Sequence, residues 1–253
     1  MIDIHSHFLP GVDDGARSVE EAVAMIEMAA ADGTTHLVAT PHCNERFAFS
    51  LERNRTLLEE LRARTGDRLT LLSGCDFHLS YENLQRVLEE KNTYTVNQGC
   101  YLLTEFAQYG IAPQVLQVFH KLHLNDIIHV ITHPERNPLL QGLGLKLLRR
   151  LVEMRCPIQI TGGSLTGGFG RDAQAMAERL LAERWVHFVA SDAHDTEHRP
   201  PRLAEARARV AKKYGAAAAQ ALFVDNPRAA LESRPLPYFP EVAPPKRRRF
   251  WFF

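Results

Sequence analysis

The sequence lacks the features that mark membrane-spanning, secreted and disulfide-rich proteins. No run reaches the ~18 apolar residues of a membrane-spanning helix. The opening Met-Ile-Asp-Ile-His has neither the basic nor the apolar region of a secretory signal. The four cysteines, at 43, 75, 100 and 156, are far apart and form no C-x-x-C pair. This usage is typical of reduced thiols rather than a disulfide or zinc framework, so we expect a cytoplasmic protein.

Net charge is also absent, because 30 basic and 30 acidic side chains cancel. This balance disfavours a nucleic-acid binder with a basic face. The charge is unevenly placed, since residues 244–253 hold four basic side chains and no acidic one. We predict one domain over residues 1–235, followed by a Pro-rich, irregular tail over 236–253. The basic and aromatic end of that tail suits contact with a membrane surface, a kinase or a second subunit, and a frayed tail is the alternative. The oligomeric state stays open, a homo-oligomer included.

The usual nucleotide-binding loops are missing as well. Neither G-x-G-x-x-G after the first strand nor G-x-x-x-x-G-K-[ST] occurs in the chain. Gly162-Gly163-Ser164 and Gly167-Gly168 are only a weak sign of phosphate binding. We interpret this segment as a flexible loop rather than a phosphate cradle.

What the chain does contain is a regular alternation of β-rich runs and helical patterns. We predict strands at 2–5, 36–40, 69–74, 101–105, 127–132, 157–161 and 186–190. A helical pattern follows each of them, and the first helix begins at Ser18 with Glu21 three residues later. Seven such repeats indicate a parallel α/β fold. The pattern alone leaves an open, doubly wound sheet and a closed barrel as alternatives.

Ionisable side chains gather at the carboxyl ends of the predicted strands. Active sites collect at this face in barrels and in open α/β sheets alike. His5 and His7 are two residues apart, so both rings point to one side of an extended strand, and Asp192 and His194 repeat that spacing. The candidate ligands are His5, His7, Asp14, His42, Asp76, Glu105, His133, Asp192 and His194.

This donor set predicts a site for more than one metal ion. Nine groups exceed what one ion takes, and the set contains no thiol, so Mn, Fe or Zn are the expected ions. Four carboxylates packed together would repel one another without cations, which is a separate reason to expect metal. Two or three ions of this kind bind phosphate and lower the pKa of a bound water.

Several motifs resemble those of the polymerase and histidinol phosphatase (PHP) superfamily. These are Met-Ile-Asp-Ile-His-Ser-His at the start, Ala39-Thr40-Pro41-His42, Thr132-His133-Pro134-Glu135-Arg136, the loop 161–170 and Ser191-Asp192-Ala193-His194. Within it, the chain is most similar to the bacterial manganese-dependent protein-tyrosine phosphatases linked to capsule and exopolysaccharide synthesis. The resemblance extends over about residues 1–235.

The resemblance implies a single-domain, distorted (β/α)7 TIM-like barrel with a trinuclear metal site of Mn, or alternatively Fe or Zn. It assigns all nine candidates as ligands, with Asp76 at a bridging position where the family usually has Glu. It matches Arg136 and Arg199 to phosphate-binding arginines. The implied reaction is phosphotyrosine hydrolysis by a metal-bridging hydroxide without a phosphoenzyme, on the tail of a tyrosine autokinase. No cysteine has an arginine six residues later, the spacing of cysteine-dependent tyrosine phosphatases.

Three other functions compete with this interpretation. A PHP phosphoesterase for histidinol phosphate or nucleotides would use the same metal site. An amidohydrolase also begins with His-x-His, but commonly has a bridging Lys at the end of strand four, where this chain has Glu105. A non-catalytic regulator would have a degraded ligand set, whereas only Asp76 departs from the family pattern here.

Overall fold

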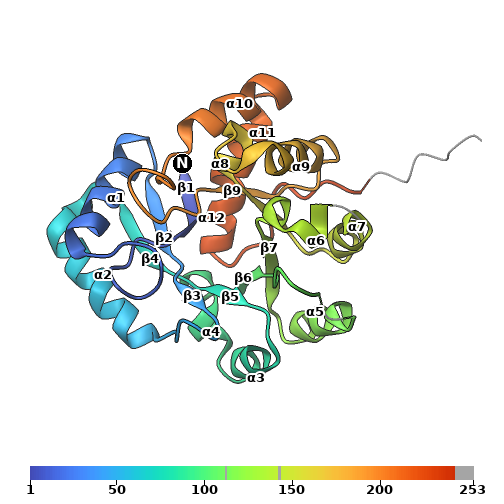
Figure 1. The fold of residues 1–253 in the computed structure, drawn as a ribbon, viewed down its shortest axis with the longest axis horizontal. Helices are drawn as coiled ribbons and strands as arrows, with labels where there is room; N and C mark the ends of the chain where they lie inside the picture. The colour runs from blue at the N-terminus through green and yellow to red at the C-terminus, as the bar shows by residue number, and fades with distance from the viewer. Residues whose placement is uncertain (112, 142–143, 243–253) are drawn as a thin grey trace, which may run out of the picture.

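The structure is a computed structural model that describes residues 1–111, 113–141 and 144–242. It is an α/β fold in which helices surround parallel strands (Figure 1). The first sheet has the order β1-β2-β4, and the second has the order β3-β5-β6-β7-β8-β9. The strands are β1 (Ile2–Ser6), β2 (His36–Ala39), β3 (His42–Cys43), β4 (Thr70–Ser73), β5 (Asp76–His78), β6 (Tyr101–Glu105), β7 (Ile128–Thr132), β8 (Ile158–Thr161) and β9 (Phe188–Ala190).

Helices connect the strands, as the alternating pattern predicts. They are α1 (Val19–Ala31), α2 (Leu51–Thr65), α3 (Tyr81–Glu89), α4 (Lys91–Tyr94), α5 (Val115–Leu124), α6 (Pro138–Gln141), α7 (Leu145–Glu153), α8 (Gly162–Thr166), α9 (Gly170–Ala182), α10 (Ala204–Tyr214), α11 (Ala216–Gln220) and α12 (Asn226–Leu231). The Ser18 side chain caps α1 by accepting a hydrogen bond from Glu21 N at 3.2 Å. This confirms the predicted start of the first helix.

The predicted number of strands is wrong for the described residues, because a short additional strand follows two of the seven expected ones. The strand expected at 36–40 is β2, and β3 follows it after Pro41. The strand expected at 69–74 is β4, and β5 follows it after Gly74 and Cys75. Proline has no amide hydrogen to give to a ladder, so the pairing is interrupted at Pro41. The short strands after both breaks pair with each other in the second sheet.

The glycine-rich segment after β8 also differs from the prediction. We expected a flexible loop, but Gly162–Thr166 forms the helix α8. Ser164 and Leu165 in this helix are buried, and the Ser164 hydroxyl donates a hydrogen bond of 2.7 Å to the buried carboxylate of Glu135. Tertiary contacts therefore stabilise a turn of helix that has low intrinsic propensity.

The segment after α12 has no regular secondary structure through residue 242. It nevertheless packs on the domain. Asn226 exchanges two hydrogen bonds with the Tyr238 backbone, at 2.8 and 3.0 Å, and the Phe239 ring lies 4.0 Å from that of His187. The basic and aromatic end of the predicted tail, residues 243–253, lies outside the described residues. No helix in the described ranges is long and apolar enough to cross a membrane.

Candidate metal centre

The first two candidate ligands meet at the end of β1. His5 and His7 are both buried, and their Nε2 atoms lie 3.2 Å apart. The other nitrogen of each ring, Nδ1, contacts a residue that is not a candidate ligand. Asp13 accepts from His7 Nδ1 at 2.7 Å, and Gln159 Oε1 lies 2.9 Å from His5 Nδ1. These contacts leave both Nε2 atoms directed at the same point, which is the orientation that metal-binding histidines need.

All nine candidate ligands lie in one cluster. Their donor atoms form four overlapping groups, each with all its atoms within 4.8 Å of one another. The groups are His7, Asp14, His42 and His194; His5, His7 and Asp192; His5, Asp76 and His133; and His42, Asp76 and Glu105. The sharing of residues between the groups favours more than one ion with common ligands.

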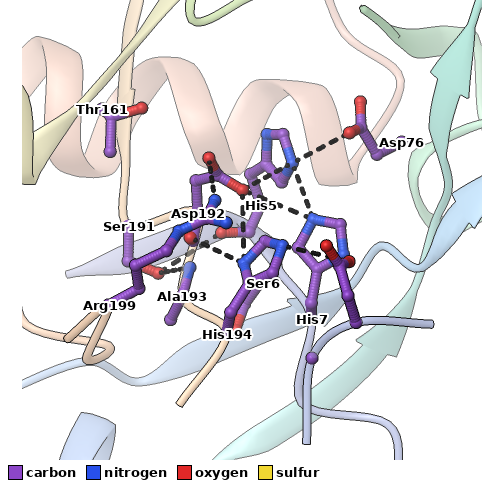
Figure 2. A network of polar contacts seen from close by, with 12 residues as sticks. His5, Ser6, His7, Asp76, Thr161, Ser191, Asp192, Ala193, His194 and Arg199 are labelled. Atoms are coloured by element: carbon purple, nitrogen blue, oxygen red, sulfur yellow. Dashed lines mark hydrogen bonds and ion pairs between the residues drawn. The ribbon is translucent and has the colours of Figure 1, made fainter. Parts of the chain in front are cut away.

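Asp192 connects the centre of this cluster to its edge (Figure 2). Its Oδ1 lies 3.4 Å from Nε2 of both His5 and His7, while its Oδ2 accepts hydrogen bonds from Arg136 and, at 2.6 Å, from Arg199. One buried carboxylate thus faces the histidines with one oxygen and both predicted phosphate-binding arginines with the other. The structure therefore brings the two arginines beside the nine candidate ligands.

Strand register places Asp76 between two of the groups. His42 on β3 is aligned with Asp76 on β5, and Nδ1 of His42 lies 3.0 Å from Oδ2 of Asp76. The same Oδ2 lies 3.6 Å from His5 Nε2. Asp76 is fully buried, and neither of its oxygens has a hydrogen-bond donor of good geometry. His42 Nδ1 and His194 Nε2 are also buried without such a partner. Buried polar atoms left in this way fit ligands for a cation.

The pKa values of three side chains in the cluster also favour a bound cation. Burial and the nearby charge of Asp76 raise the pKa of Glu105 to about 7. Burial disfavours a charge on His5, but Asp192 and Asp76 outweigh it and raise its pKa to about 9. Burial also opposes the charge on His42, yet the adjacent carboxylates of Asp14 and Asp76 raise its pKa to about 11. The crowded carboxylates therefore favour protonation of their neighbours, and a bound divalent cation would supply the same positive charge.

Two of the candidate ligands have an unusual backbone conformation. His133 follows β7 with φ 32°, and Asp192 follows β9 with φ 52°. Left-handed backbone at a non-glycine residue costs on the order of 1–3 kcal/mol and concentrates at functional sites. Asp192 therefore converges with His194 through a turn, and not through the strand alternation that the i, i+2 spacing predicts.

The site remains open to the surface on one side. The Asp14 side chain is 46% exposed, and those of Arg136 and Arg199 are 21% and 26% exposed. Next to Glu105 and His78 lies a cavity of about 440 Å³. A substrate could therefore reach the cluster from the side that these side chains border.

The sequence alone assigns no role to two residues that support candidate ligands, nor to a buried carboxylate near the site. Asp13 and Gln159 contact His7 and His5, and Glu135 is a buried carboxylate that accepts from Thr161 N at 2.9 Å. Asp13 stands next to Asp14, so a pair of adjacent carboxylates was a usable signal. Gln159 lies two residues before the end of its strand, and nothing in its own chemistry marks it in the sequence.

The family model for capsular polysaccharide synthesis, CpsB/CapC, matches residues 1–232. The tyrosine-protein phosphatase CpsB of Streptococcus pneumoniae is 34% identical over 237 residues, covering 90% of this chain and 97% of that protein. The tyrosine-protein phosphatase YwqE of Bacillus subtilis is 32% identical over the full length of both chains.

A solved structure agrees with these matches. It was reported among the crystal structures of YwqE from Bacillus subtilis and CpsB from Streptococcus pneumoniae, described as metal-dependent tyrosine phosphatases. It superposes with a TM-score of 0.88 at 31% identity and covers 98% of this chain and 100% of that one. The match of sequence and of fold along almost the whole chain shows that this protein belongs to the CpsB/CapC family of capsular polysaccharide synthesis.

Proposed function

We propose that this chain is a metal-dependent protein-tyrosine phosphatase. The observation that carries the proposal is the convergence of nine metal-type side chains and two arginines at one partly open site. The names of the relatives support the choice of phosphotyrosine as the phosphoryl donor. The substrate in this proposal is a phosphotyrosine protein, the tyrosine-rich tail of a bacterial tyrosine kinase that regulates capsule or exopolysaccharide synthesis.

The metal ligands in this proposal are the nine clustered residues, holding two or three divalent ions, with Mn first and Fe or Zn as alternatives. When bound, such ions activate water and neutralise charge on phosphoryl oxygens. Asp76, to which the resemblance gives a bridging position, belongs to two of the four groups, as do His5, His7 and His42. Its side chain is one methylene shorter than the Glu expected there, so in this proposal either the backbone of β5 lies closer to the ions or one ion is bound less tightly.

Arg136 and Arg199 would bind the phosphoryl oxygens. Both guanidinium groups already point at one carboxylate oxygen, that of Asp192, and both remain partly exposed. A planar guanidinium can bind two oxygens of a phosphate at once, and it keeps its charge at any working pH. The leaving phenolate has a conjugate acid with a pKa of ~10, so a strong general acid is not required.

The two sheets would together form the distorted (β/α)7 barrel of this proposal. The contacts between β1 and β9 support closure at one side, because His7 N donates to Ala193 O and Asp192 N donates to His5 O, both at 2.8 Å. The hydrogen bond of 2.9 Å from Thr40 N to Ser6 O continues the pairing where β1 and β2 end. Residues 1–235 would be the catalytic unit, and the free cysteines suit a cytoplasmic enzyme.

A substrate panel tests the proposal. The metal-loaded protein should release phosphate from phosphotyrosine peptides much faster than from histidinol phosphate or a 3′,5′-bisnucleotide. His42→Ala should abolish turnover, whereas His120→Ala, an exposed control on α5, should leave it unchanged. Excess chelator should remove activity and thiol alkylation should not. Preferred hydrolysis of histidinol phosphate or the nucleotide would contradict the proposed substrate.

A further inference from the structure

Phe169 lies between α8 and α9, and its ring faces both arginines of the site. The Arg136 Cζ atom lies 4.3 Å from the ring centroid, and the Arg199 Cζ atom lies 5.7 Å from it. A guanidinium within about 6 Å of an aromatic face is attracted by it. One ring therefore contacts both of the cations that converge on the metal centre.

The two arginines need such a contact because they carry like charges and share one partner. Arg136 and Arg199 both donate to Oδ2 of Asp192. Repulsion between the guanidinium groups would favour the departure of one of them when phosphate oxygens compete with that carboxylate oxygen for the N–H groups of the arginines. The face of an aromatic ring attracts both cations without accepting a proton, and it leaves Asp192 Oδ1 directed at His5 and His7.

Two glycines next to the Phe169 ring, Gly163 and Gly170, allow it to occupy this position. A Cβ atom at Gly163 would lie 3.0 Å from Phe169 Cε2 and 3.3 Å from Cδ2, so any side chain at this position would press the ring away from α8. The next residue, Gly170, has φ +85°, a conformation that side chains rarely adopt. The glycine-rich segment that the sequence predicts to be flexible thus holds one aromatic side chain against the site.

We propose that Phe169 is a positioning residue that holds Arg136 and Arg199 side by side for one phosphoryl group. This inference rests on the proposed phosphatase function, in which the arginines bind phosphate oxygens. The ring acts through the arginines and does not itself touch the phosphoryl group. Loss of the aromatic face should therefore weaken the binding of any phosphate, with or without a phenyl ring attached.

Calorimetric titration of the metal-loaded protein with inorganic phosphate tests the inference. Phe169→Leu keeps an apolar side chain but removes the aromatic face, and it should weaken phosphate binding by about 10-fold. Phe169→Tyr keeps the ring and should bind phosphate like the wild type. In an Arg136→Ala background, Phe169→Leu should have a much smaller effect, because the nearer of its two partners is gone. Metal content and thermal midpoint should match the wild type for both Phe169 variants.

Gly163→Ala provides a second perturbation that changes neither the ring nor the arginines. Its added methyl group would force the ring to move, so phosphate binding should weaken in the same direction. Equal weakening by Phe169→Leu and Phe169→Tyr would overturn the inference, since packing alone would then explain the residue. Unchanged phosphate binding in Phe169→Leu, with a loss confined to aryl phosphate turnover, would overturn it too and place the ring against the substrate.

The titration is independent of turnover. A wild-type protein that binds phosphate through Phe169-dependent arginines but does not hydrolyse phosphotyrosine would refute the proposed function and retain this inference. The reverse result, turnover of phosphotyrosine with phosphate binding that ignores Phe169, would retain the function and refute the inference.

Discussion

Asp13 offers a sharp perturbation of the candidate metal centre, because it holds two predicted ligands without being one. Its Oδ2 accepts from His7 Nδ1 at 2.7 Å and from His42 N at 3.0 Å, and its Oδ1 accepts from Gly15 N at 2.9 Å. Burial alone would raise the pKa of Asp13, but His7 and the two backbone donors outweigh it and lower that pKa. The side chain is therefore an anion that fixes the ring of His7.

Asp13→Asn keeps the shape of this side chain but removes its charge and one of its acceptors. Three donors surround the carboxylate, so the new amide NH2 group must face at least one of them. Removing a carboxylate that orients a metal-binding histidine typically costs 10–100-fold in metal affinity, or about 1.4–2.8 kcal/mol. We expect this loss for Mn²⁺ bound to Asp13→Asn.

Competition titration against a chromophoric chelator measures that affinity directly. Asp67→Asn is the matched control, because Asp67 is exposed in the turn Gly66–Arg68 and should change the affinity by less than twofold. Wild-type Mn²⁺ affinity in Asp13→Asn, with the fold intact by circular dichroism, would refute the role of Asp13 in orienting His7.

Two further predictions concern the turn after β1 and the response to acid. Gly15→Ala places a Cβ atom 1.9 Å from the His7 carbonyl oxygen, so the turn must move. We expect thermal melts to show a loss of about 1–3 kcal/mol in the free energy of unfolding, and metal binding to weaken. An unchanged melting midpoint would contradict the close approach. Burial, helped by the nearby charge of His123, lowers the pKa of His129 to about 3, so the unfolded chain binds this proton first as the pH falls below 6.5. From pH 7 to pH 5 the wild type should lose about 1–2 kcal/mol more unfolding free energy in urea than His129→Phe, and equal losses would show that His129 does not titrate on unfolding.

The convergence of the candidate ligands could be predicted because of one property of parallel sheets. The carboxyl ends of the strands meet at one edge, so residues at the ends of separate strands converge whatever their distance in sequence. His5 lies near the end of β1, Glu105 ends β6 and His133 follows β7, and all three belong to the same cluster. Because these side chains are imidazoles and carboxylates, their convergence predicts a metal site.

Other features depend on contacts that a linear pattern does not contain. Gln159 acquires its role only because β8 carries it beside His5, and a neutral amide has no spacing that marks it. The helix α8 forms at Gly162 and Gly163, two poor helix formers, because buried contacts to Glu135 stabilise it. The breaks between β2 and β3 and between β4 and β5 shift the strands from one sheet to the other, which the apolar runs do not reveal.

The central claim is that ions held by the clustered histidines and carboxylates carry out phosphotyrosine hydrolysis. The most direct measurement is phosphate release from a phosphotyrosine peptide by chelator-stripped protein as Mn²⁺ is added back in known equivalents. The account predicts background release from the stripped protein and a rise that saturates after two or three equivalents per chain. Full phosphatase activity in the stripped protein, with excess chelator present, would contradict it.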